Sequence, residues 1–151
     1  MRPIYIFDLD GTLSDASHRI PILEDKTNSR RWRDFYAACG KDLPHYHVID
    51  MLQTLRPLSG IRIWTGRSDE VRMETEAWLW KYVQIAPHKI EIKMRPADDH
   101  TPDTELKKRW LNELTPLERN HLAGVFEDRS SVVAMWRENG VRCYQVAPGD
   151  F

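Results

Sequence analysis

The chain has 151 residues, of which 41% are hydrophobic and 30% are charged, and its formal net charge is −1. This length suits a single domain over residues 1–151, and the near-zero charge excludes a general positive field that binds nucleic acid indiscriminately. No apolar run approaches the roughly 20 residues that cross a bilayer, and the N-terminus has no signal-peptide profile. Two cysteines far apart in the sequence predict neither a disulfide nor a zinc site, so we expect a cytoplasmic protein.

The segment FDLDGTL, residues 7–13, comes directly after the apolar run that predicts the first strand. A parallel strand ending here brings Asp8 and Asp10 to the carboxyl edge of a sheet, where open α/β folds bind their ligands. An Asp-x-Asp pair also begins the EF-hand calcium loop, but that loop needs a glycine and an acid where this chain has Leu13 and Arg19. The calcium interpretation therefore fails, and a purely structural turn is the remaining alternative.

Strands and helices alternate along the rest of the chain. Short apolar runs predict strands at residues 3–7, 61–64, 89–93, 122–126 and 142–146. Amphipathic spacing predicts helices at residues 48–55, 70–82, 103–114 and 130–138. Ser130 is the expected N-cap of the last helix. The alternation predicts an α/β fold with a parallel, Rossmann-like sheet flanked by helices.

Residues 14–47 interrupt this alternation after the first strand. The segment is long enough for a small helical cap, with a helix at residues 29–38, but too short for a covering domain of about 50 residues or more. Such a cap leaves the site open to a large substrate. The run Arg30-Arg31-Trp32-Arg33 could bind a nucleic-acid strand by phosphate pairing and base stacking. We favour the simpler interpretation, a solvated helix face with Trp32 buried in the cap.

Four segments, in order, resemble the motifs of the haloacid dehalogenase superfamily, most of whose members are magnesium-dependent phosphohydrolases. These segments are FDLDGTL, Thr65-Gly66-Arg67, a lysine that is either Lys107 or Lys108, and Glu127-Asp128. The resemblance implies that Asp8 attacks phosphorus to form an aspartyl-phosphate. It implies that Asp10 protonates the leaving oxygen and then activates water. Thr65 would hold a phosphoryl oxygen, and Lys107 would balance the charge of phosphate and Asp8.

The same resemblance implies a Mg²⁺ site, because this ion prefers oxygen ligands in near-octahedral geometry. The expected protein ligands are Asp8, the carbonyl of Asp10, and Asp128. Glu127 stands where the family usually has an aspartate. If Glu127 only orients Lys107, the additional methylene is tolerable; if it must reach the metal, the site is impaired.

A narrower resemblance, to the 3′-phosphatase domain of phage polynucleotide kinase-phosphatase, covers nearly the whole chain. It rests on Arg19, on an aspartate four residues before the lysine, and on residues 127–151. This likeness implies that the substrate is bound by Arg19, Gly66, Arg67 and Asp103, and it points to a phage or bacterial source. Arg19 on its own would be taken for a surface residue. Asp103 either orients Lys107 or Arg67, or is only the N-cap of its helix.

We therefore expect a Mg²⁺-dependent phosphomonoesterase that removes 3′-phosphate from polynucleotide ends. A phosphatase of free nucleotides or deoxynucleotides is the enzymatic alternative, and a binding module for phosphorylated ends, without catalysis, is the other. No Gly-x-x-x-x-Gly-Lys-Ser/Thr loop occurs, so we expect a phosphatase without a kinase half. The expected partner is a phosphorylated nucleic-acid end or nucleotide, and the oligomeric state stays open.

Overall fold

The computed structural model describes residues 1–151, and its centre is a parallel sheet of five strands in the order β5-β4-β1-β6-β7. The strands are β1 (Ile4–Phe7), β4 (Gly60–Ser68), β5 (Glu91–Arg95), β6 (Leu122–Glu127) and β7 (Cys143–Gln145). The parallel, Rossmann-like architecture predicted from the alternation of elements is confirmed.

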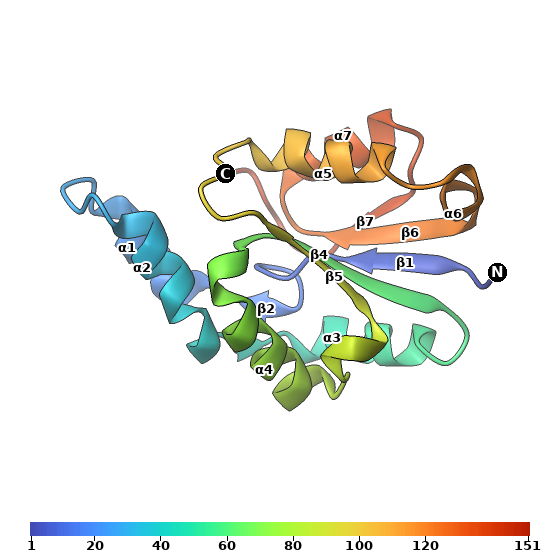
Figure 1. The fold of residues 1–151 in the computed structure, drawn as a ribbon, viewed down its shortest axis with the longest axis horizontal. Helices are drawn as coiled ribbons and strands as arrows, with labels where there is room; N and C mark the ends of the chain where they lie inside the picture. The colour runs from blue at the N-terminus through green and yellow to red at the C-terminus, as the bar shows by residue number, and fades with distance from the viewer.

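Helices cover both faces of the sheet (Figure 1). One face packs against α3 (Tyr46–Leu55) and α4 (Arg72–Val83), and the other against α5 (Asp103–Asn112) and α7 (Ser130–Glu138). The short helix α6 (Pro116–His121) leads into β6. Two short 3-10 helices lie elsewhere in the connections, at Asp69–Val71 and Pro87–Lys89. No helix combines the length and the apolar character that a membrane span requires.

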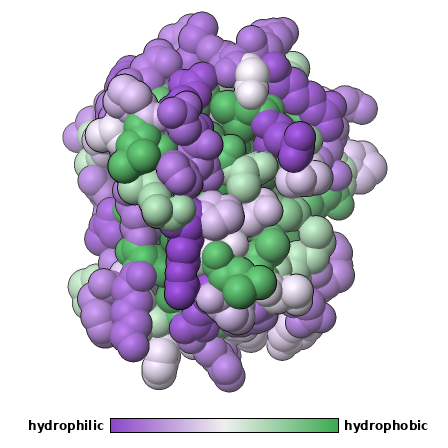
Figure 2. Space-filling view, turned by 90° about the vertical axis from the view of Figure 1, so that its right-hand side faces the viewer, coloured by the Kyte–Doolittle hydropathy of each residue, from purple (hydrophilic) through white to green (hydrophobic).

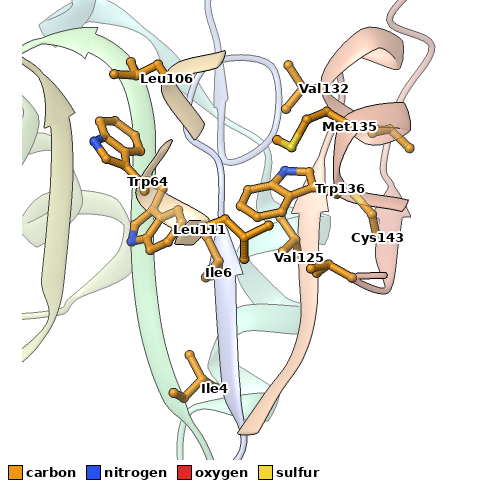
Figure 3. Packing of buried hydrophobic residues seen from close by; sticks show 13 residues of the cluster. Ile4, Ile6, Trp64, Leu106, Leu111, Val125, Val132, Met135, Trp136 and Cys143 are labelled. Atoms are coloured by element: carbon orange, nitrogen blue, oxygen red, sulfur yellow. The ribbon is translucent and has the colours of Figure 1, made fainter. Parts of the chain in front are cut away.

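Alternate residues of the inner strands β1, β4 and β6 supply two separate cores, one on each face of the sheet. In β1, Ile4 and Ile6 belong to the core under α5 and α7, whereas Phe7 belongs to the core under α3 and α4. Because both faces are covered, the central strands β1 and β6 are apolar along most of their length, whereas the edge strand β5 alternates polar and apolar residues. Figure 3 shows the core under α5 and α7, where the buried indoles of Trp64 and Trp136 have ring centroids 5.9 Å apart.

The central strand β1 determines where a ligand can bind. The chain passes from β1 to β4 and β5 and then returns to β6 on the other side of β1, so the strand order reverses between β1 and β6. Sheets of this type bind ligands at the carboxyl ends of the strands, beside this reversal. In Figure 1 these ends point left, toward α1, α2 and the C-terminus. Figure 2 shows the opposite end, where hydrophobic side chains reach the surface in several places among hydrophilic ones.

The cap is a small insertion whose base is a pair of two-residue strands. β2 (Ser14–Asp15) pairs antiparallel with β3 (Leu43–Pro44). Between them lie α1 (Ile20–Glu24) and α2 (Arg31–Ala37), with 3-10 helices at Ser17–Arg19 and Ala38–Lys41. The predicted cap helix corresponds to α2. Helix α1 was not predicted, because its five residues make less than two turns and so show no helical periodicity.

Two local expectations are wrong. Ser130 is the first residue of α7 rather than its N-cap, a position that Arg129 occupies without a capping side chain. Strand β4 does not end before Thr65 but continues to Ser68, with an irregularity in its pairing with β5 between these two residues. A bulge redirects side chains at the end of a strand. An apolar run cannot reveal it, because these residues are polar.

Candidate active site

Lys107 is the centre of a buried charge cluster at the carboxyl edge of the sheet. Its Nζ lies 2.7 Å from Asp8 Oδ1, 2.7 Å from Glu127 Oε2 and 3.6 Å from Asp103 Oδ2. Asp8 follows β1, Lys107 lies on α5 and Glu127 ends β6, so segments far apart in sequence meet here. We call Asp8, Asp103, Lys107, Glu127 and Asp128 the lysine cluster. The neighbouring Lys108 is exposed and takes no part in it.

Negative charge exceeds positive charge in the lysine cluster. Burial and the nearby Glu127 raise the pKa of Asp8 well above its ordinary value, although Lys107 acts in the opposite direction. Burial and the charge of Asp8 raise the pKa of Asp128 to about 6. Burial favours the neutral form of Lys107, but Asp103, Asp8 and Glu127 outweigh it and raise the pKa of this ammonium group.

A divalent cation fits this excess of negative charge. Carboxylate oxygens of Asp8, Glu127 and Asp128 lie within 4.8 Å of one another. Oxygen donors are those that Mg²⁺ prefers, and a cation among them would offset the like charges that raise the pKa of these acids. Gly11 adopts a φ of +82°, and a Cβ at this position would collide with Asp128 Oδ2. The turn after β1 therefore needs glycine to leave room for this carboxylate.

A second buried cluster surrounds Asp10. Arg19 Nη2 donates to Asp10 Oδ1 at 2.7 Å, and Arg67 Nη2 donates to the same oxygen. Asp42 accepts from Arg19 Nε at 2.8 Å, from Arg19 Nη2 at 2.7 Å and from Arg67 Nη2 at 3.2 Å. We call Asp10, Arg19, Asp42 and Arg67 the arginine cluster. Burial acts to raise the pKa of Asp10, but the two guanidinium groups outweigh it, and the pKa is lowered.

The two arginines differ in the donors that they leave free. Arg19 is fully buried, so its interpretation as a surface residue is wrong. Its Nη1 donates to Phe35 O at 3.3 Å, and the guanidinium carbon lies 4.3 Å from the centre of the Phe35 ring. Arg67 Nη1 donates to Thr75 Oγ1 at 3.0 Å, whereas its buried Nε has no partner. Arg67 therefore keeps one buried N–H donor without a partner, whereas every nitrogen of the Arg19 guanidinium group donates to a protein group.

Asp42 is the residue of this site that the sequence analysis missed. It is fully buried and lies directly before β3, at the base of the cap. Its carboxylate also accepts from Ser14 Oγ at 3.2 Å and contacts His18 Nε2 at 2.8 Å. No periodicity or motif marks this position, because its arginine partners lie 23 and 25 residues away in the sequence. Only the folded chain reveals that one acid holds both arginines.

Thr65 and Gly66 lie in the irregular end of β4. Thr65 is buried, and its Oγ1 accepts from the backbone N–H of Arg67 at 3.1 Å. The carbonyl of Gly66 accepts from the Tyr36 hydroxyl of the cap at 3.4 Å. A Cβ at Gly66 would collide with Asp103 Oδ1. This turn is therefore packed between the cap and the start of α5.

Asp103 is not an N-cap, contrary to one of its two expected roles. It is the first residue of α5, and Pro102 occupies the N-cap position. Its Oδ1 lies 3.4 Å from Arg95 Nη2, and its Oδ2 lies 3.6 Å from Lys107 Nζ. Arg95 in turn donates from Nε to Gly66 O at 2.8 Å. Asp103 thus lies between the lysine cluster and the turn of β4, and its arginine partner is Arg95 rather than Arg67.

Both clusters open onto one cavity of about 1180 Å³ at the carboxyl edge of the sheet. Site residues that line it include Asp8, Asp10, Gly66, Arg67, Asp103, Glu127 and Asp128. Its outer walls come from α2 of the cap, from the loop at residues 96–102 and from the C-terminal segment. Trp32 of α2 is 53% exposed and lines this cavity, so the expectation that it is buried in the cap is wrong.

The chain is a phosphatase domain of the haloacid dehalogenase type, the class of the family model that matches it, and its fold and site agree with this class. The phosphate complex of CbbY from Rhodobacter sphaeroides shares the fold, with a TM-score of 0.62 and 17% identity over 100% of this chain and 88% of that one. A narrower family is also established. The family model for the polynucleotide kinase PNKP phosphatase domain matches residues 2–151, and the chain belongs to this family.

Two relatives illustrate the family. A protein of Autographa californica nuclear polyhedrosis virus, assigned as a bifunctional polynucleotide kinase/RNA ligase, is 32% identical over 133 residues, which is 87% of this chain and 17% of that protein. A chain in the structure of a Pnkp1/Rnl/Hen1 RNA repair complex is 29% identical with a TM-score of 0.80, over 99% of this chain and 44% of that chain. This chain therefore spans less than half the length of these relatives.

Proposed function

We propose that this chain is a Mg²⁺-dependent phosphomonoesterase that removes the 3′-phosphate from polynucleotide ends through an aspartyl-phosphate. The observation that carries the proposal is the contact of Asp8 with Lys107, beside Asp128, on an open cavity. A buried carboxylate held at 2.7 Å by an ammonium group is a suitable nucleophile toward an anionic ester, because the lysine offsets repulsion between the two anions. Membership of the PNKP phosphatase family supports a nucleic-acid end as the substrate.

In the first step, an oxygen of Asp8 attacks phosphorus and the bond to the leaving oxygen breaks. Asp10 gives its proton to that oxygen, and the phosphoryl group is then bonded to Asp8. The arginine cluster favours the ionised form of Asp10 in the free protein. An arriving phosphate raises this pKa again, because like charges disfavour ionisation. Substrate binding therefore promotes the protonated acid that this step requires.

In the second step, water attacks phosphorus while Asp10 accepts its proton, and the bond to Asp8 breaks to release phosphate. Asp10 has lost its proton in the first step, so the carboxylate needed as base is already formed. Arg19 and Arg67 hold it in place through one oxygen, Oδ1. Arg19 is fully buried and each of its three guanidinium nitrogens donates to a protein group, which supports positioning of Asp10 rather than direct binding of substrate.

The carboxylates of Asp8 and Asp128, with the carbonyl of Asp10, would hold Mg²⁺. When bound, the ion would neutralise a phosphoryl oxygen. Glu127 supports the lysine instead: Oε2 lies 2.7 Å from Lys107 Nζ, and Oε1 accepts from the backbone N–H of Asp128 at 3.2 Å. Because protein groups engage both oxygens, the longer side chain is compatible with activity. Thr65, Gly66 and Arg67, which line the cavity, are the proposed contacts of the phosphoryl oxygens.

The proposal is tested by phosphate release from a 3′-phosphorylated oligonucleotide, beside a panel of 3′- and 5′-mononucleotides, with Mg²⁺ and with EDTA. Fast release from the oligonucleotide that EDTA abolishes is the expected result. Release only from mononucleotides would instead identify a phosphatase of free nucleotides. Tight binding of phosphorylated ends without turnover of any phosphomonoester would leave only the binding module.

A further inference from the structure

The cap helix α2 presents an exposed aromatic ring to the catalytic cavity. Trp32 is 53% exposed and lines the cavity that also contains Asp8 and Asp10. A large apolar ring in water is unfavourable for the free protein, and in a cavity it is a common feature of ligand sites. In Figure 1, α2 lies at the end of the molecule toward which the carboxyl ends of the strands point.

The ring is held by neighbours that themselves contact the catalytic groups. Phe35 packs edge-on against Trp32 with ring centroids 6.1 Å apart, and Tyr36 lies at 6.2 Å. Phe35 lies under the guanidinium group of Arg19, and the Tyr36 hydroxyl donates to Gly66 O. The aromatic group is therefore fixed relative to the site, which lowers the entropy lost when a ligand stacks on it.

Positive charge flanks the ring on the same cavity wall. Arg30 and Arg33 come from the same segment as Trp32 and line the cavity; Arg30 forms no ion pair, and Arg33 has an exposed contact with Glu70 at 3.2 Å. Three of the acids that line the mouth already accept hydrogen bonds within the protein, namely Asp15, Glu70 and Asp99. Asp98, in the loop at residues 96–102, is the exposed acid without such a bond.

We propose that Trp32 is a stacking platform for one base of a single nucleic-acid strand whose phosphorylated end lies at Asp8, with Arg30 contacting the backbone of that strand. This inference rests on the proposed function and deepens it. An exposed ring beside guanidinium groups suits a strand, because every base has a π-face and every linkage has a phosphate. The cavity of about 1180 Å³ also exceeds what one mononucleotide needs. We assign the stacked base to a nucleotide upstream of the terminal one, because the cavity has room for more than the terminal nucleotide.

The platform is tested first by binding, in an Asp8→Asn background that prevents turnover. The probe is a hexathymidylate with a 3′-phosphate and a 5′ fluorophore, measured by fluorescence anisotropy. Trp32→Ala should weaken binding about tenfold, and Trp32→Phe should retain most of the affinity, because a phenyl ring still stacks. Trp80→Ala is the matched control, since Trp80 is 60% exposed on α4 and does not line the cavity.

Kinetics separate stacking from a structural role of the ring. With the wild-type Asp8, Trp32→Ala should raise KM for the oligonucleotide about tenfold with little change in kcat, and should leave hydrolysis of a 3′-mononucleotide unchanged. An equal loss on both substrates would overturn the proposal, because Trp32 would then only support the site. The proposal would also be overturned if the Trp32→Ala and Trp80→Ala proteins bound the hexamer with equal affinity. It would be overturned too if the Asp8→Asn protein with an intact Trp32 did not bind the hexamer.

An abasic scan identifies the stacked nucleotide. The bases of the hexamer are removed one at a time. Removal of one particular base should weaken binding about tenfold in the Asp8→Asn protein but should have no such effect when Trp32→Ala is added. A penalty that persists in the variant at every position would contradict stacking on this residue. Failure of the proposed function would give a different result. If the hexamer bound through Trp32 but the wild-type protein released no phosphate from it, the stacking platform would stand and the 3′-phosphatase activity would be refuted.

Discussion

The two buried charge clusters differ in their balance of charge, although their central acids, Asp8 and Asp10, are two residues apart. The lysine cluster has four carboxylates for one ammonium group. The arginine cluster has two carboxylates for two guanidinium groups. The pKa of Asp8 is accordingly raised and that of Asp10 lowered. An unbalanced cluster is suited to take up a cation, whereas a balanced one keeps its geometry without a ligand.

The largest expected effect is that of Asp8→Asn. It should reduce phosphate release by about 10³-fold or more, because the nucleophile is lost. Since it removes a carboxylate from the cluster with excess negative charge, thermal unfolding should show no loss of stability. Retained activity would refute the assignment of the nucleophile, and clear destabilisation would contradict the charge imbalance.

Lys107→Ala should have the second-largest effect. Phosphate release should fall by about 10²-fold or more, and the free energy of unfolding by about 3–5 kcal/mol, because the buried carboxylates of Asp8 and Glu127 lose their only cation. Lys108→Ala is the control: its side chain is exposed, so its effect on stability should stay within about 0.5 kcal/mol. Denaturant titration and the phosphate assay check both values. The reverse ranking of the two variants would assign the catalytic lysine to position 108.

Asp42→Asn should disturb the balanced cluster. The change keeps the shape of the side chain but leaves two buried guanidinium groups with one carboxylate, so we expect a loss of about 3 kcal/mol in stability. The kcat should fall about 10- to 100-fold with a smaller change in KM, because Asp10 is no longer held. Asp50→Asn, at an exposed position on α3, is the control and should change neither quantity. Wild-type kcat in Asp42→Asn would show that Asp10 is positioned without Asp42.

Magnesium should act on one cluster only. At about 100 times its Kd, Mg²⁺ should stabilise the folded protein by about 2.7 kcal/mol and raise Tm by several degrees. Asp128→Asn should remove this shift in Tm. Asp42→Asn should show the same shift, although its Tm without Mg²⁺ is lower than that of the wild type. Differential scanning fluorimetry with Mg²⁺ and with EDTA measures both. An equal Mg²⁺ shift in the Asp128→Asn protein would place the ion elsewhere.

The smallest expected effect is on pH dependence in EDTA. The pKa of Asp128 is about 6 in the folded protein, against about 3.9 in an unfolded chain. The folded state thus binds more protons between these values, and stability should increase by about 1–2 kcal/mol as the pH falls from about 7 to 5. Asp128→Asn should flatten this slope in urea titrations. A slope of the opposite sign would mean that Asp128 is stabilised as a carboxylate without metal.

Residues that follow strands were predictable. Asp8 and Asp10 come after one apolar run and Glu127 and Asp128 end another, and parallel strands deliver their carboxyl ends to one edge of the sheet. Their juxtaposition follows from topology once the alternation of strands and helices is recognised. Lys107 depended on the resemblance to a family, because spacing alone did not separate it from Lys108.

Asp42 and Trp32 were not predictable, because their roles depend on contacts between segments. Asp42 belongs to a stretch with no periodicity, and its arginines come from the cap and from β4. Trp32 lies in a run of arginines whose pattern fits a buried ring as well as an exposed one. Its position on the cavity wall is decided by how α2 packs through Phe35 and Tyr36.

By itself, the sequence determined the alternation of strands and helices, the parallel sheet and the acids at its carboxyl edge, since these depend on local periodicity and on chain order. Only the tertiary structure decided which charges share a cluster and which face of the cap meets the cavity. The physical reason is that charge balance and exposure are sums over neighbours in space. In this chain, the neighbours that matter to Asp42 lie more than 20 residues away.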